Sequence, residues 1–167
     1  MNIILCGFMG SGKSTVGKKL AKSIGYTFID LDDYIEKQRN MSITDIFSKY
    51  GEENFRESET QSVKDISKLT NQVISLGGGT VLNPLNDEIL KQCGKIFLLN
   101  VSPECVYERL KYDNKRPLLQ TDDKLKKITE LLEKRMPIYK QSADYIIETD
   151  NKSAEDVAKA IIEKINF

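Results

Sequence analysis

The sequence predicts an α/β fold in which a five-stranded parallel sheet lies between two layers of helices, as a three-layer sandwich. Three observations predict it. Five short apolar runs alternate with longer stretches of helical periodicity, the runs are apolar throughout, and a phosphate-loop motif directly follows the first run. Runs without polar alternation are typical of strands buried on both faces, as in a parallel sheet. A length of 167 residues fits one domain, residues 1–167.

The expected strands are short and rich in β-branched or aromatic side chains. They cover residues 3–6, 27–29, 73–76, 96–99 and 145–147. Between them, apolar residues recur every three or four positions, which predicts amphipathic helices. The clearest helices cover residues 13–23, 43–67, 103–111 and 153–165. Repeated alternation of strand and helix predicts helices on both faces of the sheet.

Two segments are neither strand nor core helix in pattern. Residues 32–67 hold two or more helices where one would connect neighbouring strands, so this insertion is expected to add a substrate-binding part. Residues 112–124 are polar and are broken by Pro117. They form either a surface connection or a lid over an active site.

Composition and charge exclude several function classes. Lys and Arg number 25 and Asp and Glu number 25, and this zero balance argues against a nucleic-acid binder. No histidine is present, which excludes Ser-His-Asp catalysis and imidazole zinc sites. Cys6, Cys93 and Cys105 form no CxxC pair and are expected to be free thiols. With no basic leader and no apolar run of about 20 residues, we expect a cytoplasmic protein without a membrane partner.

The most specific single motif is GFMGSGKST at residues 7–15, which matches GxxxxGK[ST]. Its glycines let several backbone N–H groups point at one phosphate, and the helix that follows directs its positive end at the same anion. The Lys13 side chain reaches the β- and γ-phosphates, and the Ser14 hydroxyl takes a Mg²⁺ position. The motif predicts binding of a nucleoside triphosphate with Mg²⁺ through Gly10, Ser11, Gly12, Lys13, Ser14 and Thr15.

Two further groups of residues follow expected strands. Asp30 and Asp32 end the second run, and as strand residues they would point to the same side. One carboxylate could then serve Mg²⁺ and the other accept a hydroxyl proton, unless Asp32 or Asp33 is merely a helix N-cap. Gly77, Gly78 and Gly79 follow the third run and form either a tight turn or a ligand contact. With no carboxylate there, Mg²⁺ should depend on Ser14 and Asp30.

Arginine is scarce in a chain that uses lysine for ordinary surface charge. An arginine here is more plausibly needed for its planar fork, which grips a carboxylate or phosphate at two points. Arg56 lies in the helical insertion with Glu59 three residues on, where Glu59 could orient it, and Arg116 lies in the lid segment. Arg135 follows in a helical stretch, whereas Arg39 has no motif and is expected to be a surface charge. Taken singly, each could also form a surface ion pair.

Taken together, these features resemble the shikimate kinase family over residues 1 to about 165. The match comprises the phosphate loop, Asp30-x-Asp32, Phe55-Arg56, the three glycines, Arg116-Pro117-Leu118-Leu119, and Arg135 with Tyr139, in the family's order. The resemblance implies a P-loop NTPase fold of the nucleoside monophosphate kinase type. It also implies phosphoryl transfer from ATP to the 3-hydroxyl of shikimate, giving shikimate 3-phosphate and ADP in aromatic amino-acid (chorismate) biosynthesis, by a monomer.

The resemblance also implies residue roles. Asp32, Lys13 and Arg116 would be catalytic. Arg56 and Arg135 would grip the shikimate carboxylate, and Gly77, Gly78 and Gly79 would line the substrate. Ser14 and Asp30 would hold Mg²⁺. Arg109 and Lys152, the latter in the loop 149–154, would contact adenine, although Ala154 replaces a frequent proline there and Leu31 replaces a frequent Thr or Ser. Ile43, Phe47 and Phe55 would form an apolar wall beside the ring.

Two other readings share some of these features. A kinase of a sugar acid or of a nucleoside monophosphate would have the same loop and lid, but the latter would need arginines grouped for an acceptor phosphate. A GTP-binding switch would need an NKxD motif after the fourth strand. The nearest strings, at residues 114–117 and 151–154, lack the Asp.

Overall fold

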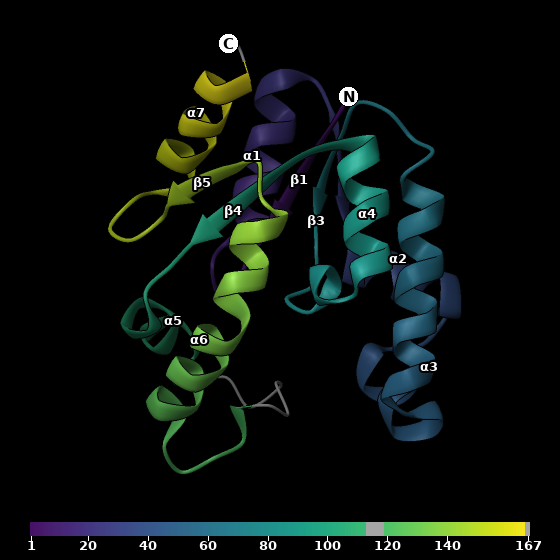
Figure 1. Ribbon diagram of the computed structural model, residues 1–167, viewed down its shortest axis with the longest axis vertical. Coiled ribbons are helices and arrows are strands. Elements are labelled where there is room, and N and C mark those ends of the chain that lie inside the picture. The colour runs from purple at the N-terminus through teal and green to yellow at the C-terminus, as the bar shows by residue number, and fades with distance from the viewer. Residues whose placement is uncertain (113–118, 166–167) are drawn as a thin grey trace.

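The computed structural model describes residues 1–112 and 119–165, and it has the predicted α/β sandwich (Figure 1). Five parallel strands pair in the order β2-β3-β1-β4-β5. The strands are β1 Asn2–Cys6, β2 Thr27–Asp30, β3 Gln72–Ser75, β4 Gly94–Asn100 and β5 Tyr145–Glu148. The α-helices are α1 Lys13–Ile24, α2 Leu31–Arg39, α3 Ile43–Ile66, α4 Pro84–Cys93, α5 Pro103–Leu110, α6 Lys124–Ser142 and α7 Ala154–Ile165.

Each face of the sheet carries its own apolar core. Along β1, Ile3 and Leu5 belong to the core shared with α1 and α7, whereas Ile4 and Cys6 belong to the core shared with α2 to α6. Since successive side chains of a strand point to opposite faces, a strand covered on both sides must be apolar at every position. This confirms the expectation for β1 and for most of β3 and β4, whereas the edge strands β2 and β5 are only partly covered and Ile146 is 45% exposed.

The insertion between β2 and β3 consists of α2 and α3. Ser42 caps the start of α3 by accepting a hydrogen bond from the Asp45 N–H. The helix is broken at Gly51, where φ is 82° and ψ is 172°, so the segments before and after this residue are two helical pieces joined at a kink. Between β3 and α4 lies a short 3₁₀ helix, η1, at Thr80–Leu82.

One local prediction is wrong. The strand β2 ends at Asp30, and Asp32 lies in the first turn of α2. Asp30 is the helix N-cap, where its Oδ1 accepts hydrogen bonds from the N–H groups of Asp32 at 3.1 Å and Asp33 at 3.4 Å. A helix start leaves its first N–H groups without helical acceptors, so a carboxylate at this position favours helix over a longer strand.

The carboxyl ends of the parallel strands meet at one edge of the sheet. The loop 7–12 follows β1, Asp30 ends β2 and Gly77 to Gly79 follow β3, so the topology gathers three predicted groups at this edge. Ligands bind at such edges in open α/β sheets. Of the helices that the structure describes, none is long and apolar enough to cross a bilayer.

Candidate active site

The loop between β1 and α1 has the geometry of an anion cradle. Gly12 is the N-cap of α1 with φ at 91°, a left-handed conformation that glycine adopts without strain. The first N–H groups of α1 point toward the loop, and Gly12 has no side chain that could accept from them, so they can serve an anion. The Lys13 ammonium is nearly buried inside the loop. It donates to the carbonyl oxygens of Gly7 at 2.8 Å and Phe8 at 2.9 Å.

Ser14, Asp30 and Ser75 form a small oxygen cluster beside this loop. The Ser14 hydroxyl donates to Asp30 Oδ2 at 2.5 Å and lies 3.3 Å from the Ser75 hydroxyl. Asp30 uses its other oxygen to cap α2, so its position is fixed by the helix as well as by Ser14. Magnesium takes oxygen ligands and commonly completes its shell with water and phosphate oxygens, so this donor set fits Mg²⁺. Sequence reasoning missed Ser75, although a serine ending an apolar run was a signal.

The three glycines after β3 each face a different charged side chain. A β-carbon at position 77 would lie 3.1 Å from Asp32 Oδ1, and one at position 78 would lie 3.5 Å from Arg135 Nη1. At position 79 a β-carbon would lie 2.9 Å from both Nη1 and Nη2 of Arg56. Only a residue without a β-carbon allows the Arg56 guanidinium this close to the backbone. The loop thus brings together Asp32, Arg56 and Arg135 from α2, α3 and α6.

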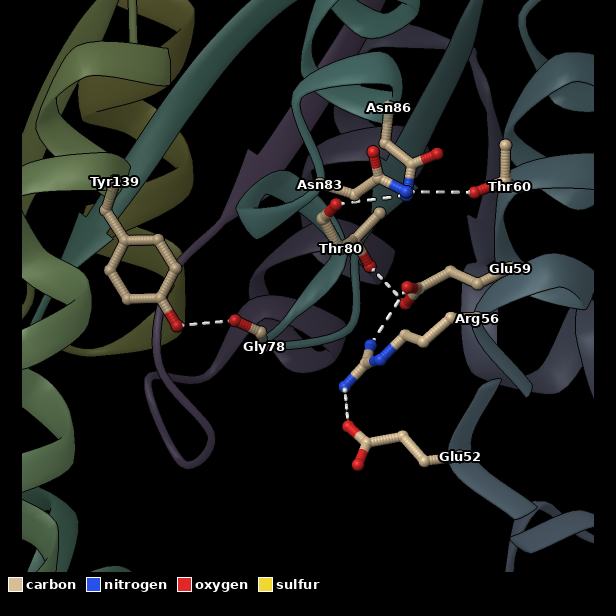
Figure 2. Close-up of polar contacts among 9 residues, drawn as sticks. All are labelled: Glu52, Arg56, Glu59, Thr60, Gly78, Thr80, Asn83, Asn86 and Tyr139. Atoms are coloured by element: carbon tan, nitrogen blue, oxygen red, sulfur yellow. Dashed lines mark hydrogen bonds and ion pairs between the residues drawn. The ribbon is translucent and has the colours of Figure 1, made fainter. Parts of the chain in front are cut away.

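Arg56 is held by a buried carboxylate, as Figure 2 shows. Its Nη1 donates to Glu59 Oε1 at 2.9 Å, and Glu59 is only 1% exposed. The other oxygen of Glu59 accepts a hydrogen bond from the Thr80 hydroxyl at 2.8 Å. This confirms the expectation that Glu59 orients Arg56. Thr80 was missed, because nothing in a sequence says which side chain lies across from it.

Helix α6 approaches the glycine loop from the side opposite to Arg56 (Figure 2). The Tyr139 hydroxyl donates to the Gly78 carbonyl oxygen at 2.5 Å. Burial raises the pKa of Tyr139 to about 12, against an opposing effect of Arg135, so the phenol stays protonated as a donor. Arg135 lies one turn earlier on α6, with its Cζ 5.7 Å from the ring centroid of Phe8 in the phosphate loop. Arg135 therefore lies between the phosphate loop and Gly78.

Asp32 has the most perturbed carboxyl group of the site. Burial, together with the negative charges of Asp30 and Glu59, raises its pKa to about 6, and Lys13 acts in the opposite direction. A carboxyl group with this pKa is mostly ionised at neutral pH and still able to take up a proton, which suits a general base.

The expected adenine contacts are only partly brought together. Arg109 donates to the carbonyl oxygen of Gly10 at 2.7 Å, so it lies against the phosphate loop. Its charge also acts on the Asp150 carboxyl group, which lies in the loop 149–154. Lys152 is exposed in that loop, and its backbone N–H donates to Thr149. Arg116 and residues 113–118 of the expected lid lie outside the described residues.

Two of the three residues expected to form an apolar wall, Phe47 and Phe55, lie together beside Arg56. The rings of Phe47 and Phe55 lie 4.8 Å apart between centroids, and the Cζ of Arg56 lies 5.2 Å from the Phe55 ring. Phe55 is buried in the core, and Ile43 packs against the same core, whereas Phe47 is 37% exposed. Their role toward a ligand stays a prediction.

Comparisons with known proteins show what the chain is similar to. A family model described as "Shikimate kinase" matches residues 9–166. A shikimate kinase of Thermodesulfovibrio yellowstonii is 47% identical over 163 residues, which cover 98% of this chain and 94% of that protein. A structure of shikimate kinase from Acinetobacter baumannii in complex with shikimate has a TM-score of 0.94 at 39% identity, covering 99% of this chain and 92% of that one.

A more distant structure supports the fold alone. The YorR protein of Bacillus subtilis, in complex with phosphorylated GDP, superposes with a TM-score of 0.68 at 20% identity, covering 99% of this chain and 96% of that one. Together these likenesses confirm the predicted fold class, a P-loop NTPase of the nucleoside monophosphate kinase type.

The raised pKa of Asp32 predicts that this residue destabilises the fold at neutral pH. The folded chain holds the Asp32 proton more tightly than the unfolded chain, so stability falls as pH rises from about 4 to about 6. We expect Asp32→Asn to raise the free energy of unfolding by about 1–3 kcal/mol at pH 7. The gain should vanish toward pH 4. Urea unfolding at pH 7 and pH 4.5 measures it.

The exposed neighbour Asp33 offers a matched control, since Asp33→Asn removes a charge from the same helical turn. A gain from Asp32→Asn that is absent at pH 7, or as large at pH 4.5 as at pH 7, would contradict the assigned environment of Asp32.

Proposed function

The chain belongs to the shikimate kinase family, so it is an ATP-dependent kinase of shikimate, and we propose that the transfer takes place at the carboxyl edge of its sheet. The reaction gives shikimate 3-phosphate and ADP in aromatic amino-acid biosynthesis. The observation that carries the site assignment is the convergence of Asp32, Arg56 and Arg135 on the three-glycine loop beside the phosphate loop.

The acceptor is a small carboxylate that bears hydroxyl groups, and the charges around the glycine loop suit it. Two arginines on opposite sides of the loop can grip one carboxylate with several charge-assisted hydrogen bonds. Glu59 already occupies part of the Arg56 fork and leaves Nη2 directed toward the loop and toward Glu52, 3.6 Å away. Asp32 lies at the other end of the loop, against Gly77, where a ring hydroxyl would meet it.

Asp32 acts as the general base in this proposal. The 3-hydroxyl oxygen forms a bond to the γ-phosphorus, the bond from that phosphorus to the bridging oxygen of ADP breaks, and the hydroxyl proton passes to Asp32. Phosphoryl transfer needs mainly positioning and charge stabilisation from the protein, which a chain without histidine can supply. The backbone of Gly78 and Gly79 lines the path between acceptor and phosphate.

Lys13 and the phosphate loop hold the donor. Lys13 leaves the Gly7 and Phe8 carbonyl oxygens for the β- and γ-phosphates, and Arg116 is assigned to the same transferring group. Ser14 and Asp30 would hold Mg²⁺. When bound, this ion adds positive charge that stabilises the phosphate oxygens. Arg109 and Lys152 are assigned to the adenine.

The arrangement also suggests how the chain is divided. Residues 32–67, which hold α2 and α3, act as the substrate-binding insertion of a single kinase domain, and residues 112–124 act as the lid. The enzyme works as a monomer in the cytoplasm without nucleic acid. Its zero net charge and its three free cysteines support that assignment.

A coupled assay of ADP release with Mg-ATP tests the acceptor. It compares shikimate with gluconate and a panel of nucleoside monophosphates. Release with shikimate alone is expected. Release with another acceptor would refute the roles proposed for Arg56, Arg135 and Asp32, but the phosphate loop would still be the proposed ATP site. Binding of ATP without release to any acceptor would refute catalysis by this site.

Arg56→Ala is expected to raise the KM for shikimate by about 100-fold, because a charge-assisted grip worth about 2–3 kcal/mol is lost. The KM for ATP should stay within about twofold, since Arg56 contacts the acceptor side only. The variant also leaves the buried Glu59 unpaired. Steady-state kinetics are therefore measured in both the native and the Glu59→Gln backgrounds.

Lys64→Ala, an exposed cation on the same helix, is the matched control. An equal rise of both KM values in the Arg56→Ala variant would show that Arg56 does not belong to the acceptor site.

The raised pKa of Asp32 sets the expected pH dependence of the reaction. A general base works only when ionised, so kcat/KM for shikimate should rise with pH through an apparent pKa near 6 and then level off. Asp32→Asn should lower kcat by about 10²- to 10⁴-fold and remove this limb. A limb near pH 6 that persists in the Asp32→Asn variant would assign the titration to another group, such as the nucleotide.

A further inference from the structure

Helix α2 carries a line of polar side chains that reaches beyond the site. Asp32, Glu36 and Arg39 are spaced by four and three residues, so they follow one face of the helix. Asp32 lies at the glycine loop. One turn on, Glu36 Oε2 accepts a hydrogen bond from the Ile43 N–H at 2.9 Å, which ties α2 to the start of α3. Arg39, at the end of α2, makes the third connection.

Arg39 is not the isolated surface charge expected from the sequence. It is half-buried, and its Nη1 donates to Asn54 Oδ1 at 2.9 Å and to the Ser58 hydroxyl. The Ser58 hydroxyl in turn donates to the Asn54 carbonyl oxygen at 3.0 Å, so this acceptor pair is itself fixed on the helix. The guanidinium carbon of Arg39 also lies 5.3 Å from the centroid of the Tyr50 ring.

These contacts span the break in α3. Tyr50 precedes Gly51, and Asn54 and Ser58 follow it. The helical hydrogen bonds do not fix the angle between the two pieces at a residue with φ of 82° and ψ of 172°. A side chain that contacts both pieces does restrict that angle. Arg39 is therefore placed to set the direction of the piece that carries Arg56 and Glu59.

The side on which Arg39 contacts this piece of α3 also restrains the helix. Ser58 and Asn54 share one side of the helix, whereas Arg56 lies two residues from each, roughly 200° around the axis. On the Arg56 side the helix is tied to η1 through Glu59 and Thr80. Arg39 holds the opposite side, so the helix is restrained against rotation from two directions.

We propose that Arg39 is a positioning residue for the acceptor site, which fixes the separation and relative orientation of Asp32 on α2 and Arg56 on α3. The inference rests on the proposed function, because those two groups must meet the hydroxyl and the carboxylate of one rigid ring at the same time. The guanidinium donates to two acceptors and lies over the Tyr50 ring, which a lysine ammonium reproduces only in part.

The test compares the KM for shikimate and the KM for ATP in Arg39→Met, which keeps the apolar stem and removes the donors. We expect the shikimate KM to rise roughly five- to twentyfold, because small displacements of positioning groups are costly, and the ATP KM to stay within about twofold. Arg39→Lys should recover part of the loss. Lys37→Met, which removes an exposed cation from the same helix, should match the wild type.

A second variant, Asn54→Ala with Ser58→Ala, removes the acceptors and leaves Arg39 in place. It should raise the shikimate KM similarly, and adding Arg39→Met should raise it little further, since all three changes remove one connection. A lowered melting temperature with an unchanged shikimate KM would show that Arg39 is merely structural and would overturn the proposal. Equal rises in both KM values would do the same. Wild-type protein that releases no ADP with shikimate would instead refute the proposed function itself.

Discussion

The buried carboxylate of Glu59 is the contact on which the acceptor side of the site depends. A carboxylate that is 1% exposed is costly unless both oxygens are paired, and Glu59 meets this need with Arg56 on one oxygen and Thr80 on the other. The two partners come from α3 and from the segment after β3. Satisfying one buried charge therefore also fixes the distance between the insertion and the glycine loop. The close approach of Arg56 to Gly79 follows from that distance.

The need to pair a charged group with hydrogen-bond donors also explains why three neighbouring carboxylates differ in their properties. Asp30 is surrounded by donors, from Ser14 and from the N–H groups that start α2, and Glu59 is surrounded by Arg56 and Thr80. Asp32 is left with burial and with the repulsion of these two neighbours, which raise its pKa. Burial and the charges of its neighbours thus make Asp32 a carboxyl group well able to accept a proton. Its reactivity is a consequence of how the other two are held.

The sequence predicted those features that depend on local periodicity and short motifs. The five strands, the phosphate loop and the family were confirmed, because apolar runs and glycine spacing are properties of neighbouring residues. The end of β2 was predicted wrongly, since capping by Asp30 competes with strand extension over only two residues. The hydroxyls of Ser75 and Thr80 were missed because their partners are 61 and 21 residues away. The roles assigned to the site residues stay predictions.

The scarcity of arginine correctly indicated that these side chains are used for fixed contacts, but the expectation that Arg39 is only a surface charge was wrong. Each arginine that the structure describes makes a directional or stacked contact: Arg39 with Asn54, Arg56 with Glu59, Arg109 with the Gly10 carbonyl and Arg135 over Phe8. Exposed lysines such as Lys68 and Lys159 instead pair with carboxylates one turn away on the surface, which contributes little. Arg39 therefore resembles Arg56 in that its guanidinium is held by specific acceptors. The absence of a motif around Arg39 reflects only that its acceptors lie on another helix, where no pattern along α2 can reveal them.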